Sequence, residues 1–142
     1  MHTIHNDPHF LRISVTGKVD QQSLYDAQKE LMLHPDYPYK NSLWVFDAAC
    51  ECKFSSLIMY EMLSRIKSFF PLDGIKKKAA IIALTNTFYS FVKLFCDEAE
   101  HEGIPFTIKP FRSLNEAEVW LTAGLTVRSR LNVIAAGVST RT

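Results

Sequence analysis

Two short apolar runs constrain the fold of this chain more than any other feature of its sequence. Residues 43–46 and 79–84 are apolar without interruption, which is typical of strands buried on both faces of a parallel sheet. Each run is followed by a segment in which apolar residues recur at three- and four-residue steps, the spacing of a helix with one buried face. Strands that alternate with helices in this way predict an α/β fold with a mostly parallel sheet.

The first residues indicate an antiparallel hairpin ahead of these alternating units. Leu11, Ile13 and Val15 share one face of residues 9–16, the period-two pattern of a half-buried strand. Residues 3–5 can supply its partner strand, and the Asn-Asp-Pro between the two is a turn signal. The hairpin is the expected antiparallel exception in the sheet.

Four helices and one further strand are expected along the rest of the chain. Residues that can cap a helix stand ahead of each apolar stripe of helical period, namely Asp20, Ser55 or Ser56, Thr85 or Asn86, and Ser113. Residues 106–108 alternate between two prolines, which favours a strand at or near a sheet edge. The sequence therefore predicts an α/β fold: a mostly parallel four- or five-stranded sheet with an antiparallel N-terminal hairpin and about four packed helices.

The length of 142 residues fits one domain. We assign residues 1–124 to this domain and residues 125–142 to a C-terminal extension, because Gly124 ends the last expected helix. We expect Leu131, Val133 and Ile134 in the extension to dock on an apolar surface, either of the same domain or of a second copy. The second alternative makes the protein a homodimer.

Charge and composition narrow the class of partner. The chain has 16 Lys and Arg residues and 15 Asp and Glu residues, a net charge of +1, which does not favour a nucleic-acid partner. No apolar segment approaches the ~20 residues that span a bilayer, and the first residues lack the apolar core of a signal peptide. We therefore expect a cytoplasmic protein with no integral membrane segment and no nucleic-acid partner.

Five short segments occur in an order and at a spacing shared with a known family. They are residues 13–19 (ISVTGKV), 33–37 (LHPDY), 43–47 (LWVFD), 79–82 (AAII) and 111–121 (FRSLNEAEVWL). In these segments the chain resembles the STAS-like, or SpoIIAA-like, group of anti-sigma-factor antagonists, which is related to the Sec14-type lipid-binding fold. The resemblance covers about residues 9–123. It implies helices packed on a four- or five-stranded sheet, in a protein that is usually cytoplasmic and bacterial and that acts on a protein partner.

The same resemblance draws attention to one serine. The phospho-switch form of the family carries Asp-Ser-Ser-Gly at the start of the helix after the central strand, where this chain has Phe54-Ser55-Ser56-Leu57. Ser55 stands where the phosphorylated serine would be, whereas Phe54 and Leu57 depart from the family pattern. The residues themselves predict that Ser55 caps a helix.

Polar side chains follow the expected strands at the edge where parallel sheets bind ligands, outside the carboxyl ends of the strands. They are Asp47, Asn86 and Arg112, with Ser55 and Ser56 at the start of a helix. These five residues are the predicted site for a protein partner. Asp47 can accept hydrogen bonds from its own loop or pair with Arg112, and the structural alternative is that these residues fix loops and cap helices.

Aromatic residues are more numerous in the second and third helices than two packed helices usually need. The predicted lining of a largely apolar ligand cavity of ~300–1,000 Å³ consists of Leu57, Tyr60, Phe88, Tyr89 and Val92. Core packing is the alternative role for these rings. If the cavity exists, the chain is a small carrier or sensor of a fatty or otherwise apolar ligand.

Catalytic, metal and cofactor sites are not expected. Cys50 and Cys52 lack the second ligand pair of a zinc site, and Cys96 falls on an apolar helix stripe. No phosphate-binding glycine motif is present, and the lysines at 76–78 are expected to form a solvated loop. The leading hypothesis is a non-enzymatic regulatory protein-interaction module, and the alternative is the apolar-ligand carrier.

Overall fold

The computed structural model describes residues 1–52, 55–69, 77–104 and 106–123. Its main sheet has five strands in the order β1-β2-β4-β6-β7. These strands are β1 (His2–Asn6), β2 (Phe10–Val15), β4 (Asn41–Phe46), β6 (Lys78–Ile82) and β7 (Thr107–Phe111). β1 pairs antiparallel with β2, and the other neighbours pair parallel. The predicted fold class and the N-terminal hairpin are confirmed.

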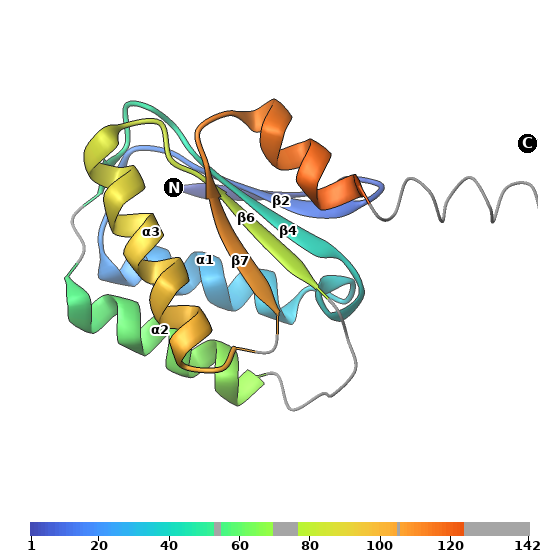
Figure 1. Cartoon of the computed structure of the whole chain (residues 1–142), viewed down its shortest axis with the longest axis horizontal. Helices are drawn as coiled ribbons and strands as arrows, with labels where there is room; N and C mark the ends of the chain where they lie inside the picture. The colour runs from blue at the N-terminus through green and yellow to red at the C-terminus, as the bar shows by residue number, and fades with distance from the viewer. Residues whose placement is uncertain (53–54, 70–76, 105, 124–142) are drawn as a thin grey trace, which may run out of the picture.

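The helices lie on both faces of this sheet (Figure 1). They are α1 (Gln21–Leu33), α2 (Ser56–Phe69), α3 (Asn86–His101) and a helix at residues 114–123, with a short 3₁₀ turn η1 (Tyr37–Tyr39) after α1. From β2 to β7, each strand of the main sheet is added on the same side of the strand before it. Because parallel crossovers are right-handed, α1, α2 and α3 cover one face. The helix at 114–123 covers the other.

Local capping explains where these helices begin. The Asp20 carboxylate accepts from the Ser23 N–H at 2.8 Å, and the Ser23 hydroxyl accepts from the Asp20 N–H at 2.9 Å, a reciprocal cap at the start of α1. Thr85, not Asn86, caps α3 by accepting from the Phe88 N–H at 3.2 Å. Ser113 accepts from the Glu116 N–H at 3.2 Å, as the sequence predicts for the last helix.

Each central strand is buried on both faces, as the uninterrupted apolar runs predict. Leu43 lies in the core beneath the helix at 114–123, together with Ala117 and Leu121. The next residue along β4, Trp44, packs against the core under α1, α2 and α3, where Ile13 and Leu63 are almost fully buried. The domain therefore has two apolar layers, one on each side of the sheet.

A short pair of strands was not expected from the sequence. β3 (Lys18–Val19) pairs parallel with β5 (Glu51–Cys52) in a separate two-stranded sheet. Strands of two residues carry no readable periodicity, so only the path of the chain reveals this pairing. It joins the segment after β2 to the segment after β4, beside the carboxyl ends of those strands.

The expectation of a solvated lysine loop is wrong for Lys77 and Lys78. Lys77 is only 4% exposed, and its Nζ donates to the Tyr37 carbonyl at 2.5 Å and lies over the Tyr37 ring. The Nζ of Lys78 donates to the Trp120 carbonyl at 2.9 Å. Long aliphatic stems allow lysine to cover apolar surface. Both lysines therefore pack against neighbouring elements on either side of the sheet.

Several sequence predictions fall outside the described residues. They concern Phe54 and the C-terminal extension at 125–142, including the docking of Leu131, Val133 and Ile134. The described part of the domain ends at residue 123.

The second apolar layer gives a testable prediction about stability. Leu121 is 1% exposed in the core beneath the last helix, whereas Val119 on the same helix is 60% exposed. We expect Leu121→Ala to lower the free energy of unfolding by ~2–5 kcal/mol through lost burial and a cavity. We expect Val119→Ala to change it by less than ~0.5 kcal/mol. Urea unfolding followed by circular dichroism measures both, and similar values for the two variants would show that the last helix is not docked.

Candidate functional site

A cleft of about 270 Å³ opens at the carboxyl ends of β4 and β6. Its walls come from the loop after β4, from the segment between β6 and α3, and from the first turns of α3. Asp47, Thr85 and Thr87 give it polar groups, and Leu84 and Phe88 give it apolar surface. We call this cleft the edge cleft. Among its described lining residues, Asp47 is the one that belongs to the predicted partner site of Asp47, Ser55, Ser56, Asn86 and Arg112.

Asp47 is held within its own loop. Its Oδ1 accepts from the Ala49 N–H at 3.0 Å, and its carbonyl accepts from the Cys50 N–H at 2.9 Å. Its own N–H donates to the Val15 carbonyl at 3.0 Å, which ties the loop to the end of β2. Of the two interpretations open from the sequence, the structure shows the bond to a loop amide.

Arg112 and Asn86 are brought together by the fold. The guanidinium of Arg112, just after β7, donates to Asn86 Oδ1 at 2.6 Å and lies 4.3 Å from the centre of the Tyr89 ring. A cation over an aromatic face is attracted by the ring quadrupole. Arg112 therefore links the end of β7 to the first turn of α3, and it faces Asn86 rather than Asp47.

Ser55 is exposed immediately before α2, and Ser56 is the first residue of that helix. The Ser55 hydroxyl accepts from the Ile58 N–H at 3.4 Å, a long bond in the position of an N-cap. Ser55 is therefore an exposed residue whose hydroxyl contributes to the helix start.

The cap at Ser55 gives a prediction about stability. We expect Ser55→Ala to lower the free energy of unfolding by ~0.5–1 kcal/mol, the lower part of the range for caps, because the bond is long. Ser64→Ala, at an exposed position inside the same helix, is the matched control and is expected to be neutral or stabilising by up to ~0.5 kcal/mol. Thermal unfolding compares the two, and an unchanged stability of Ser55→Ala would exclude the cap.

The residues predicted to line a ligand cavity separate into two groups. Phe88 and Val92 line an internal cavity of about 80 Å³ between the sheet and α1, α2 and α3. Leu57 and Tyr60 lie on the outer face of α2, 63% and 50% exposed. Tyr89 is half-buried beneath Arg112. The cavity is thus in the core, and it is smaller than the ~300–1,000 Å³ of a drug-sized pocket.

Two polar side chains outside the predicted sites line this internal cavity. Gln28 on α1 is 2% exposed and Ser42 on β4 is 1% exposed. The Gln28 Nε2 donates to the Met62 carbonyl at 3.0 Å. Within the described part of the chain, Gln28 Oε1 and Ser42 Oγ have no hydrogen-bond partner. A glutamine within the apolar stripe of α1, four residues after Leu24, was the signal available in the sequence.

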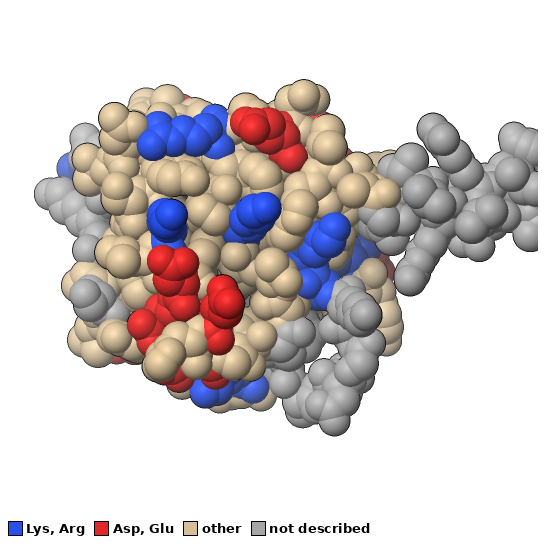
Figure 2. Space-filling view, viewed as in Figure 1, with Lys and Arg blue, Asp and Glu red and all other residues tan. Residues whose placement is uncertain are grey.

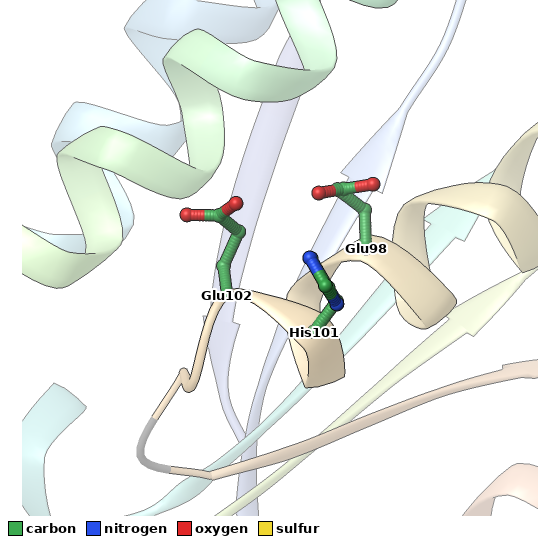
Figure 3. A group of neighbouring side chains, drawn as sticks. All are labelled: Glu98, His101 and Glu102. Atoms are coloured by element: carbon green, nitrogen blue, oxygen red, sulfur yellow. The ribbon is translucent and has the colours of Figure 1, made fainter.

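Acidic side chains gather over the C-terminal half of α3 on the face shown in Figure 2, with Lys and Arg more widely spread. Glu98 and His101 on α3 and Glu102 directly after it are at helical spacing, and their ligand atoms all lie within 4.8 Å of one another (Figure 3). A histidine and two carboxylates are ligand types that transition metals accept. Glu102 also pairs with Lys67 at 3.4 Å, so one of its oxygens already has a cationic partner.

The described cysteine side chains have structural surroundings. The Cys50 thiol donates to the Val15 carbonyl at 3.1 Å. Cys96 is buried in a cluster with Ala83 and Val92. Burial raises the pKa of its thiol to about 12, with a smaller contribution from Asp97. A thiol with so high a pKa stays protonated at neutral pH and is a poor nucleophile.

The buried lysine predicts a specific dependence of stability on pH. Burial lowers the pKa of Lys77 from 10.5 to about 6, so between those pH values the unfolded chain carries a proton that the folded chain has released. The free energy of unfolding therefore rises with pH across this window, and the lysine opposes folding most at pH values below about 6. Lys77→Met removes this contribution and flattens the profile.

Urea unfolding of the wild type and Lys77→Met between pH 6 and 9.5 measures the difference. Lys93→Met, at an exposed position on α3, is the control and is expected to keep the wild-type slope. Parallel profiles for the wild type and Lys77→Met would contradict the prediction.

In comparisons with known proteins, no protein-family model and no curated protein matches the chain. Among the described helices, none combines the length and the apolar character needed to cross a bilayer.

Proposed function

We propose that this protein is a non-enzymatic regulatory module that binds another protein at the carboxyl-end face of its sheet. The observation that supports the proposal is the edge cleft, which combines Asp47 and Thr85 with the apolar Leu84, 45% exposed. Protein–protein interfaces combine an apolar centre with a polar rim. The resemblance to anti-sigma-factor antagonists, noted from the sequence, points to the same class of function.

The polar groups around this edge favour binding over catalysis. Thr85 caps a helix, Asp47 holds its loop, and Arg112 bonds to Asn86. These bonds fix the shape of the edge, and a fixed surface loses little entropy when a partner docks on it. Ser55, exposed at the start of α2, is the position through which phosphorylation would add charge near this edge.

A second candidate function has its own supporting observation. The internal cavity is lined almost entirely by apolar side chains, and Phe88 and Val92 of the predicted ligand site are among them. We propose, as the alternative, that the chain carries or senses a small apolar ligand in this cavity.

The partner proposal is tested by changing one exposed residue in the cleft. We expect Leu84→Asp to lower retention of a partner from a lysate of the source cells at least tenfold. The reason is that a charge replaces apolar contact area and must be desolvated on docking. The matched control is Leu33→Asp, 65% exposed at the end of α1. This residue lies toward the amino ends of the parallel strands, away from the edge cleft. Its variant should retain the partner as the wild type does.

Quantitative mass spectrometry of the captured proteins gives the readout, and a dissociation constant for the purified partner completes it. Ser55→Asp compared with Ser55→Ala shows whether negative charge at that position weakens the complex. Equal retention by the wild type and Leu84→Asp would exclude the edge cleft as the interface.

A further inference from the structure

We propose that the internal cavity binds a small, neutral, mainly apolar molecule with a hydroxyl group, which exchanges hydrogen bonds with Gln28 and Ser42. This proposal rests on the second candidate function and names the chemistry of its ligand. It does not depend on a protein partner at the edge cleft.

The cavity exists because two small side chains stand side by side in the sheet. Ser42 on β4 is in register with Ala79 on β6, and both line the cavity. Their outer neighbours in the same row are Leu11 and Ile108. Protein interiors are normally filled to crystal-like density. Placing the two smallest residues of the row next to each other leaves space above them that the helices do not fill.

The orientation of the Gln28 amide is determined by its neighbour. Its Nε2 donates to the Met62 carbonyl at 3.0 Å, and a carbonyl can only accept. The other amide atom is therefore the oxygen, Oε1. This oxygen is buried and has no donor within the described residues. A buried acceptor without a donor destabilises a fold. A ligand group that donates a hydrogen bond to Gln28 Oε1 would therefore bind favourably here.

The hydroxyl of Ser42 has hydrogen-bonding requirements that complement those of Gln28. Its hydroxyl is 1% exposed and has no partner within the described residues, and it can both donate and accept. A hydroxyl on the ligand can also donate and accept, so it matches both side chains. A carboxylate offers no donor to Gln28 and brings a charge into apolar surroundings, whereas a hydrocarbon leaves both polar atoms unpaired.

The remaining lining sets the size and character of the rest of the ligand. The cavity of about 80 Å³ is surrounded by apolar residues such as Leu31, Phe88 and Phe95. It exceeds the ~10–15 Å³ that one water molecule needs. A short hydrocarbon chain or a single ring fits this volume better than a long fatty chain.

The test compares 1-butanol with n-pentane, in which a methyl group replaces the hydroxyl. Dissociation constants are measured by NMR titration of the full chain. We expect 1-butanol to bind, and we expect its affinity relative to n-pentane to fall about tenfold in Ser42→Ala and in Gln28→Met, the effect of losing about one hydrogen bond. Gln22→Met, at an exposed position on the same helix, should keep the wild-type ratio.

The outcomes distinguish recognition of a hydroxyl from the more general proposals of an apolar-ligand cavity and of a partner at the edge cleft. An unchanged ratio in both variants overturns the recognition of a hydroxyl, although saturable n-pentane binding would leave an apolar-ligand cavity in place. If neither compound binds, ordered water is the partner of Gln28 and Ser42, and the proposal is wrong. Ser42→Ala removes only one oxygen atom, so it remains informative if Gln28→Met does not fold. Retention of a partner at the edge cleft is measured independently of these titrations.

Discussion

The right-handed crossover is the constraint on which the rest of this structure depends. The strands from β2 to β7 follow one another in one direction across the sheet, so each crossover places its helix on the same face. Three helices share that face, and one thick apolar layer forms beneath them. The opposite face is left to the helix at 114–123, whose Ala117 and Leu121 cover a thinner layer.

This strand order also determines where a ligand can bind. Open α/β sheets usually bind ligands where the strand order reverses and neighbouring loops diverge to opposite faces. The parallel strands here contain no such reversal. The carboxyl edge therefore offers the edge cleft, of about 270 Å³, at its surface, while a smaller gap in the packing, of about 80 Å³, lies between the sheet and its three helices. The two candidate sites are a consequence of the same topology.

Three phenylalanines belong to both sites. Phe46, Phe88 and Phe91 line the internal cavity and the edge cleft. The Phe46 and Phe88 rings meet edge to face with centres 4.7 Å apart. Aromatic rings in such contact form a wall that two sites can share. Under the two proposals above, a molecule in the cavity that displaced Phe88 would also change the shape of the edge cleft, because Phe88 lines both.

The fold could be predicted from the sequence because its signals are local. Apolar runs, helical stripes and caps such as Asp20 and Ser113 each act within a few residues. The cavity could not be predicted in its actual place, because it depends on the register that sets Ser42 beside Ala79 across two strands. Tertiary packing likewise decided that Lys77 is buried and that Tyr60 is exposed.

Polar groups in the main core are concentrated toward the amino ends of the parallel strands. Ser42 is near the start of β4, and Lys77 directly precedes β6 and lies over the Tyr37 ring. Toward the carboxyl ends of the strands the cavity lining includes Phe88 and Phe91, which also line the edge cleft. A ligand of the proposed kind, held by its hydroxyl at Ser42, would direct its apolar part toward those rings. In that arrangement the polar end would fix the proposed ligand, and its apolar end would meet the phenylalanines that also line the edge cleft.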